Sequence, residues 1–305
     1  FFFLDLTAAN VALICLFSDS LNALFPSISV VSFKLIGFVT ISPLSFVSLK
    51  FLSFTSVIGI FGTSLLLLIT VFNGLYNCTS PGSLLHPAST TLFPTNLNYL
   101  PLSIGLFMSP FGGLPVFPSI YRDMRQPVKF PRAASISYAI ATGLEFSMGI
   151  IGYLMFGRAI LPEVTQSVLD TGRVVWLNAI LVAVIAIVPV SKMPLSVRPI
   201  CVTLDGIFKV NGIFGKSVNR VLANAVPVLL SILFPKFERV VGFAGAFLCF
   251  SICVVFPLLF YMKIFEGQIS LFKRIVMWIV IVWGTISAGL GTIWACESLF
   301  LKVSL

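Results

Sequence analysis

Charged residues are scarce in this sequence. Only 10% of the 305 residues are Asp, Glu, Lys or Arg, whereas 58% are hydrophobic. Soluble domains contain about 25% charged residues, and disordered chains have low hydrophobicity, so the composition excludes both classes. The apolar stretches are long and continuous, unlike the ~10-residue alternating segments of a membrane β-barrel. The sequence therefore predicts an all-α polytopic membrane protein.

Histidine is almost absent, since His86 is the only one in the chain. Zinc, haem and facial-triad iron sites generally need more imidazoles than this, and the six cysteines form no CxxC pair. We therefore expect no metal site and no cofactor. A Ser-His-Asp hydrolase needs an orienting carboxylate, but no charged residue lies between Tyr76 and Tyr121. An intramembrane enzyme is thus disfavoured.

Apolar windows of a length suited to membrane spans recur along the chain. Nine are found, at roughly 5–25, 33–49, 51–75, 100–121, 133–156, 173–195, 218–235, 238–262 and 272–297. The segment 196–217 is amphipathic and interrupted by glycine, which predicts a cytoplasmic loop with an interfacial helix. Because the chain opens on three phenylalanines without an initiator Met, we expect it to start within or beside a span.

The net charge of +9 indicates membrane orientation and not nucleic-acid binding, because excess Lys and Arg marks cytoplasmic loops. With the connection after the fourth span in the cytoplasm, 13 of the 19 basic residues fall on that side. This orientation places Phe1 in the cytoplasm and Leu305 on the opposite side. It also makes 76–100 a non-cytoplasmic loop, where Asn77 begins a glycosylation acceptor pattern. Such three-residue patterns also arise by chance.

Small residues form two helical stripes near the carboxyl end of the chain. Cys249 and Cys253 lie one helical turn apart, following Gly242 and Ala246. A similar stripe in the last span contains Gly284, Ala288, Gly291 and Ala295. Small residues let membrane helices approach closely, so both stripes predict helix packing.

The fourth span contains three prolines and two glycines between Ser109 and Pro118. Proline removes a backbone donor and clashes with the preceding turn, so a regular helix is not expected to continue. In hydrocarbon the freed backbone groups need protein, water or ligand partners, and transporters place such breaks at their substrate sites. The N-terminal end of a half-helix attracts a carboxylate, and exposed carbonyls accept from an ammonium. Such a break therefore suits both charged groups of a zwitterionic amino acid. The predicted substrate-binding residues are Ser109, Phe111, Gly112, Gly113 and Leu114; the alternative is a simple proline kink.

Two acidic residues within the spans are candidates for proton coupling. Glu145 lies mid-span on a stripe with Ala141, Gly149 and Gly152, which predicts that it points into the helical bundle. A carboxylate in the membrane is costly, and low dielectric favours its protonated form. The alternative for Glu145 is a neutral, hydrogen-bonded carboxyl group. Asp19 lies close to the end of the first span, where a solvated or capping role is the alternative.

Several motifs together resemble the amino acid/auxin permease family, and in particular the fungal vacuolar amino acid transporters. The longest runs from Ser109 through Tyr121 to Met124, and a second covers Gly152 to Gly157. Shorter supporting stretches are 18–26 and 194–199. The similarity extends over essentially the whole chain.

The resemblance implies a single transmembrane transporter domain over 1–305, of the eleven-helix inverted-repeat (APC/LeuT-like) fold with broken first and sixth helices. The nine spans would then match helices three to eleven, with the first two absent. The implied activity is secondary active transport of amino acids, in antiport with protons, in a vacuolar-type membrane or alternatively the plasma membrane. The implied partners are the amino acid, protons and the lipid bilayer.

One departure from the family pattern concerns the predicted site. Family members usually have Gly-His-Ala where this chain has Gly113-Leu114-Pro115, which removes a polar contact for substrate or proton. A function of another class is an amino acid sensor without net flux, which would signal through the basic segment 192–220.

Overall fold

The structure is a computed structural model that describes the backbone of residues 1–47, 49–91, 93–94, 100–161, 163–171, 175–210 and 212–300. Side chains at 49–53, 102, 115, 119, 123, 175 and 296–300 also lie outside the described set. The predicted loop 76–100 is therefore described only in part, and the basic residues Arg173 and Lys302 fall outside it. The described residues contain helices and turns and no strands. The predicted all-α fold is confirmed.

Each predicted apolar window contains helix in the structure. Six helical segments are long and apolar enough to cross a membrane, and a seventh apolar helix, α2 (Val30–Leu44), is shorter. The six comprise α1 (Phe2–Leu24), most of α3 (Leu49–Tyr76), α6 (Phe130–Phe156) with its flanking turns, most of α8 (Val175–Ile207), the run from α10 to α11 (Phe237–Ile264) and most of α12 (Leu271–Phe300). These spans make the protein a polytopic helical membrane protein.

The segment 196–217 differs from the loop expected there. α8 continues to Ile207, and α9 (Ile213–Leu233) begins soon after it, so most of the segment is helical. Val197 and Ile200 are buried, and their apolar packing stabilises the helix in this region. The glycines that follow had suggested that the helix would end earlier. The predicted loop is thus limited to the few residues between the two helices.

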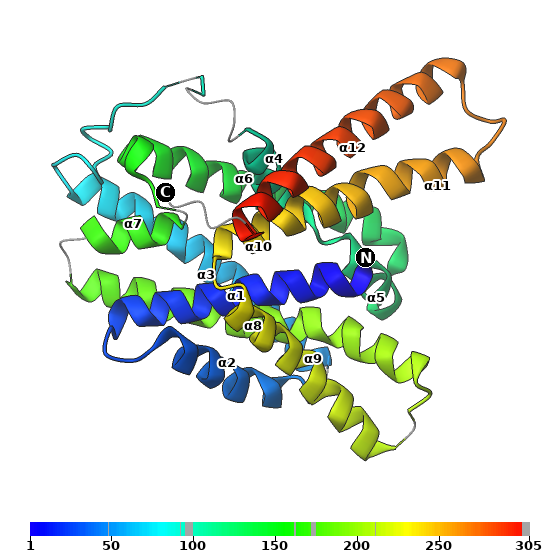
Figure 1. The fold of residues 1–305 in the computed structure, drawn as a ribbon, viewed down its shortest axis with the longest axis horizontal. Coiled ribbons are helices and arrows are strands. Elements are labelled where there is room, and N and C mark those ends of the chain that lie inside the picture. Colours follow the sequence, from blue (N-terminus) through cyan, green and yellow to red (C-terminus); the bar gives the residue numbers. More distant parts are fainter. Residues whose placement is uncertain are drawn as a thin grey trace. The chain divides into compact units, whose positions relative to one another are not determined.

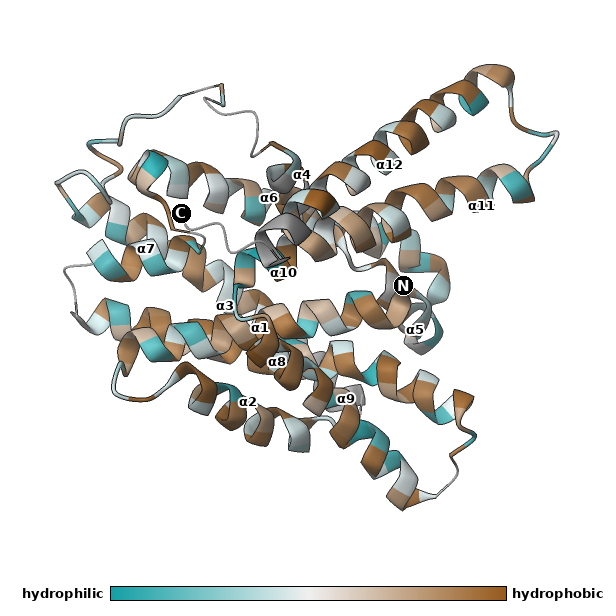
Figure 2. Ribbon diagram, in the orientation of Figure 1, coloured by the Kyte–Doolittle hydropathy of each residue, from teal (hydrophilic) through white to brown (hydrophobic). Residues whose placement is uncertain are grey.

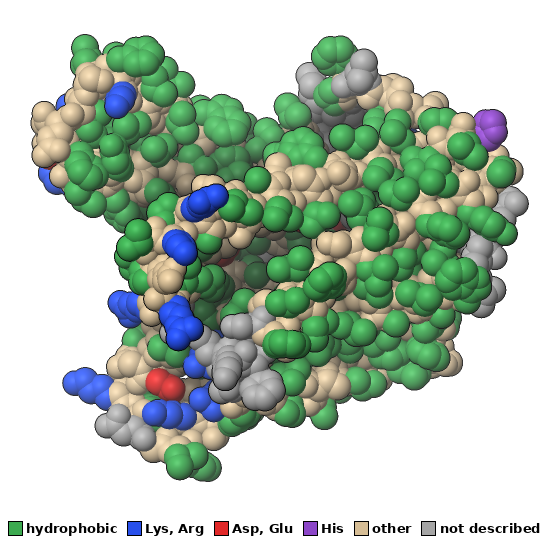
Figure 3. Space-filling view, turned by 180° about the vertical axis from the view of Figure 1, so that it is seen from behind, with side chains coloured by type: hydrophobic (Ala, Val, Ile, Leu, Met, Phe, Trp, Pro, Cys, Tyr) green, Lys and Arg blue, Asp and Glu red, His purple; other side chains and the backbone are tan. Residues whose placement is uncertain are grey.

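Large apolar side chains are exposed along the spans. On α3, Phe54 and Phe61 are 73% and 71% exposed, and Figure 2 shows α11 and α12 mostly hydrophobic along their length, with hydrophilic residues near the turn that joins them. Figure 3 shows hydrophobic side chains over most of one face and Lys and Arg in small parts of it. A soluble monomer rarely exposes such extensive apolar surface, so these side chains form a lipid-facing surface.

The chain divides into two compact units. Unit 1 contains Phe1–Ala12, Pro94–Asp123 and Phe234–Leu305, and unit 2 contains Leu13–Phe93 and Met124–Leu233. In unit 1, α4 (Leu100–Met108) packs against α12 and against the continuous helical run of α10 (Phe237–Phe243), η6 (Ala244–Val255) and α11 (Phe256–Ile264). α11 and α12 form a hairpin (Figure 1).

The small-residue stripes of unit 1 allow close helix approach, as predicted. A Cβ atom on Gly105 of α4 would lie 2.8 Å from the carbonyl oxygen of Gly242 and 2.9 Å from the Cβ of Ala246. A Cβ atom on Gly291 of α12 would lie 2.6 Å from the same Ala246 Cβ. Only glycine fits at these contacts, and the packing function of the stripes is confirmed.

Unit 2 is built around α3 and α8, which pack against each other, while α2 and α9 pack together and against α8. One of its core clusters is apolar and comprises Ile69, Met155, Phe156, Val168, Leu177, Leu181 and Ile185. These residues come from α3, α6, α7 (Val164–Thr171) and α8. Burial of such side chains stabilises the unit through close packing.

At one end of unit 2, backbone hydrogen bonds connect the described part of the 76–100 loop to the end of α6. The amide of Gly82 donates to the carbonyl of Met155 at 2.8 Å, and that of Ala88 donates to Leu154 at 2.9 Å. At the other end, the Asn224 amide of α9 donates to the Ser45 hydroxyl after α2 at 2.8 Å. The third and fifth spans therefore finish at the same end, as alternating sides require.

Candidate functional site

The break in the fourth span is a feature of unit 1. α4 ends at Met108, a 3₁₀ turn covers Ser109–Phe111, a second covers Leu114–Val116, and α5 follows at Phe117–Asp123. Within the break, the Gly112 amide donates to the Ser109 carbonyl at 3.2 Å and the Gly113 amide to the Phe111 carbonyl at 2.9 Å. The helix is interrupted over several residues and not simply bent, so the predicted break is confirmed.

Gly112 lies at a close approach between the break and η6. A Cβ atom built on it would lie 2.7 Å from the Cys249 sulfur and 3.3 Å from the Ser109 carbonyl oxygen. The same position is 3.8 Å from Oδ1 of Asp5 on α1. A larger side chain would not fit at this position. The absence of one lets the Cys249 thiol and the Asp5 carboxylate lie close to the backbone of Gly112.

Asp5 is the acidic group of the break. It is 5% exposed, and the thiol of Cys249 donates to its Oδ1 at 3.9 Å. The same thiol is 3.9 Å from the Ser109 carbonyl oxygen, and the Cys253 thiol is 3.7 Å from the Phe111 carbonyl oxygen. A carboxylate and two backbone carbonyls thus gather at one break, with weakly donating thiols between them.

Both cysteines lie in η6, which is π-helical over Ala244–Val255. π-Helical segments are rare and occur frequently at functional sites. Cys249 and Cys253 were predicted to serve packing, and the structure adds contacts with the break. The sequence prediction missed Asp5 and the π-helix; the available signal for Asp5 was an acidic residue in an otherwise apolar span.

The break has the electrostatic character of a cation site. Carbonyl oxygens and a carboxylate attract an ammonium group, and a low-dielectric surrounding strengthens that attraction. Of the predicted site residues, Ser109, Phe111 and Gly112 contribute backbone close to Asp5 or the cysteines. The Leu114 backbone interacts with Cys253. Gly113, which precedes Leu114 in the break, is partly exposed.

The predicted proton-coupling residues both belong to unit 2. Asp19 is half-buried on α1 and lies within electrostatic reach of Lys34 on α2. Glu145 is exposed on α6, as are Ala141 and Gly149 of its stripe. A Cβ atom on Gly149 would meet nothing within 4 Å. Glu145 thus lies on a face of α6 that is exposed within unit 2, although Gly152 of the same stripe is buried, and its proton-coupling role stays a prediction.

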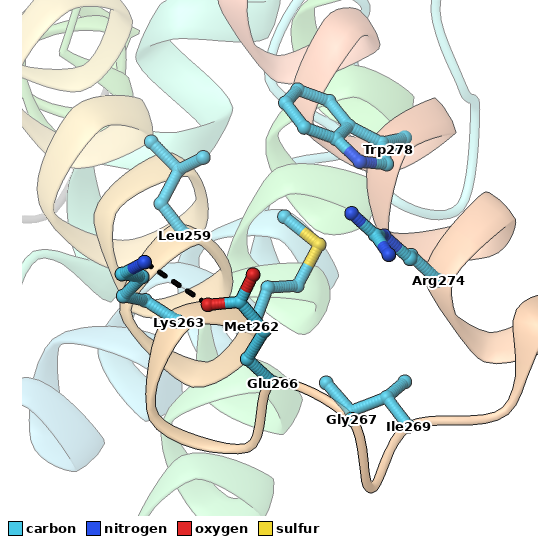
Figure 4. Close-up of a pocket in the computed structure, with 8 residues that line it drawn as sticks. All are labelled: Leu259, Met262, Lys263, Glu266, Gly267, Ile269, Arg274 and Trp278. Atoms are coloured by element: carbon cyan, nitrogen blue, oxygen red, sulfur yellow. Dashed lines mark hydrogen bonds and ion pairs between the residues drawn. The ribbon is translucent and has the colours of Figure 1, made fainter.

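Two further features involve residues other than those of the break. The side-chain oxygen of Asn77 accepts from the Thr79 hydroxyl at 3.2 Å within the glycosylation pattern. At the α11–α12 turn, a shallow pocket of about 200 Å³ is lined by Glu266, Arg274 and Trp278 (Figure 4). Lys263 and Glu266 form an exposed ion pair of 3.0 Å there, and the Lys263 ammonium lowers the pKa of Glu266.

Interrupted membrane helices are a common feature of secondary transporters. The sequence model described as transmembrane amino acid transporter protein matches residues 1–296, and the chain belongs to this family. This finding confirms the resemblance inferred from the motifs.

Several relatives from Arabidopsis thaliana are similar over nearly the whole chain. Amino acid transporter AVT1D is 28% identical, over 95% of this chain and 54% of the relative. Amino acid transporters AVT1C and AVT1B are each 25% identical over 99% of this chain, covering 56% and 57% of the relatives. The chain therefore spans about half the length of these curated relatives.

Proposed function

We propose that the protein carries amino acids across a vacuolar-type membrane by secondary active transport, in antiport with protons. Membership of an amino acid transporter family supports the substrate class. The observation that carries the proposal is the break at Ser109–Leu114, where backbone carbonyls lie beside the buried Asp5 carboxylate.

In the proposed bound state, the amino acid's ammonium group lies against the carbonyls of Ser109 and Phe111. Asp5 supplies the opposite charge, because an ammonium entering low dielectric needs a paired carboxylate. Phe111 and Leu114 present apolar side chains at the break, which suits a substrate with an uncharged side chain. Glycine at position 112 lets η6 approach the break closely, since a side chain there would meet Cys249.

Proton coupling is proposed to use membrane carboxylates of unit 2. Asp19 is supported by its half-buried position and by the nearby charge of Lys34. Glu145 remains a second candidate, and its interaction with Lys192 supplies a charged neighbour. A carboxylate that alternates between charged and neutral forms can couple proton movement to a change in conformation.

The test is transport by the natural full-length protein in proteoliposomes. An imposed pH gradient should drive uptake of amino acids with uncharged side chains, and Gly112→Leu should abolish it. Gly143→Leu is the matched control, because a Cβ atom at Gly143 would meet nothing within 4 Å. Unchanged apparent affinity in Gly112→Leu would contradict the site. Substrate binding without counterflow would instead indicate a sensor.

A further inference from the structure

Three ionisable side chains, two buried and one half-buried, form a cluster at one end of unit 2. Glu163, just before α7, is 7% exposed, and Lys34 of α2 is 2% exposed. Asp19 of α1 lies within electrostatic reach of both. The Lys34 ammonium donates to the Ser231 carbonyl of α9 at 2.6 Å, which holds it in place. The cluster therefore connects residues from distant parts of the chain.

The formal charges of this cluster do not balance. Two ionised carboxylates and one ammonium leave a net charge of −1, and two of these three groups, Lys34 and Glu163, are buried. Burying an uncompensated charge is costly, and a buried group generally neutralises itself by changing protonation. Uptake of a single proton by one carboxylate would make the cluster neutral.

Of the two carboxylates in the cluster, Glu163 has less compensation for its negative charge. Its Oε2 accepts one hydrogen bond, from the Gln166 amide at 3.1 Å, and Asp19 is the charged neighbour that acts on it. Lys34 acts directly on Asp19 and also on Cys15 of the same helix. The ammonium therefore stabilises the Asp19 carboxylate, and the negative charge of Asp19 in turn disfavours ionisation of Glu163.

Asp19, at one side of the cluster, also lines a cavity. A hollow of about 260 Å³ is lined by Asp19 and by Asn22, Leu161, Gln166 and Asp170, among others. Asp170, on the same short helix as Gln166, is exposed, and so is Arg158 before it. These exposed groups are in contact with solvent, whereas Glu163 is not.

We propose that Asp19, Lys34 and Glu163 form a one-proton site, with the proton held on the Glu163 carboxylate, and that this site couples protons to transport. This inference rests on the proposed transport function. A solvent proton adds to the carboxylate to give the neutral acid, and the same proton is released to water when Glu163 is again exposed. No other reactant is required.

The titration range of Glu163 fits this role. Burial, together with the charge of Asp19, raises the pKa of Glu163 to about 7, while the Gln166 hydrogen bond opposes the change. The group is therefore mostly protonated in acidic solution and mostly ionised above neutral pH. A pH difference across a membrane in this range changes its charge.

The test compares Glu163→Gln with Asp170→Asn in the natural full-length protein reconstituted in proteoliposomes. Glu163→Gln mimics the neutral acid, so we expect gradient-driven uptake to fall to the rate without a gradient. Counterflow of unlabelled against labelled amino acid should continue, since exchange needs no net proton movement. Asp170→Asn should retain both activities.

The outcomes separate the two proposals. If the unmodified protein shows neither gradient-driven uptake nor counterflow, the transport function is wrong. If it shows both and Glu163→Gln still responds to the gradient, the proton site is wrong. Infrared titration of the carboxyl stretch checks the assignment independently of transport: a band titrating near pH 7 should be lost in Glu163→Gln. Persistence of that band would overturn the assignment to Glu163.

Discussion

Two regions of the molecule each contain three prolines, yet only one of them is broken. Pro189, Pro194 and Pro199 lie inside α8, which remains helical over 33 residues. Pro110, Pro115 and Pro118 accompany the interruption between α4 and α5. Proline content therefore does not by itself decide whether a span is broken.

The difference lies in the neighbours of the prolines. In α8, the Ser191 hydroxyl donates to the Val188 carbonyl at 2.7 Å and the Ser196 hydroxyl to the Met193 carbonyl at 2.9 Å. These carbonyls are not the ones that the prolines leave free, so the clearer difference is glycine content: α8 has no glycine until Gly206. The break instead contains Gly112 and Gly113, which offer neither side-chain support nor helix propensity.

The largest effect is expected where α4 packs against η6. Gly245→Val would drive a side chain into the carbonyl of Gly105, so we expect a loss of at least about 3 kcal/mol of stability from overpacking. Thermal unfolding in detergent measures this loss. Gly289→Val is the control, since a Cβ atom there meets nothing within 4 Å; equal stability of the two variants would contradict the packing.

A glycine pair in α8 should reproduce part of the break. Replacing Leu195 and Ser196 together by glycine removes helix propensity worth about 1 kcal/mol per residue and the Ser196 hydrogen bond, worth about 1 kcal/mol more. We expect a total loss near 3 kcal/mol, measured by chemical unfolding. The alanine pair at the same positions should lose less, and equal losses would show that glycine is not the decisive residue.

A side chain at Gly112 should have a smaller effect, which a second substitution can relieve. Gly112→Ala places a Cβ atom 2.7 Å from the Cys249 sulfur, and we expect a cost of about 2 kcal/mol. Cys249→Ala removes that sulfur, so the double variant should be more stable than the sum of the single variants. Additive losses would place the strain elsewhere.

The smallest effect is expected from a single hydroxyl in α8. Ser196→Ala removes one hydrogen bond within a helix that is otherwise well packed, so we expect a loss of about 1 kcal/mol with transport retained. Thermal unfolding and uptake assays measure the two quantities. A loss of transport comparable to that of Gly112→Leu would contradict the contrast between the two regions.

The sequence allowed prediction of features that depend on local chemistry. Proline and glycine act on the backbone at their own positions, so the break at Ser109–Leu114 was predictable. Glycine stripes likewise act through the absence of a side chain, and Gly242 and Gly291 lie at close contacts as predicted. The family resemblance followed from motifs that contain these same residues.

Features that depend on tertiary contacts were not predictable. Asp5 and Cys249 meet although 244 positions separate them, and no local pattern connects them. Glu145 was assigned inward because its stripe contains small residues, but Ala141, Glu145 and Gly149 are exposed, while Gly152 is buried. The burial of Glu163 depends on α1 and on packing around α7, and its position in a short connection gave no sign of it.

The most direct measurement of the central claim uses Cys253, whose thiol is 3.7 Å from the Phe111 carbonyl oxygen in the break. A variant of the natural full-length protein would retain only Cys253, and a parallel variant only the exposed Cys78. A transported amino acid should slow labelling of Cys253 by a membrane-permeant thiol reagent and leave Cys78 labelling unchanged. Equal labelling of Cys253 with and without that amino acid, in a variant that still transports it, would contradict a substrate site at the break.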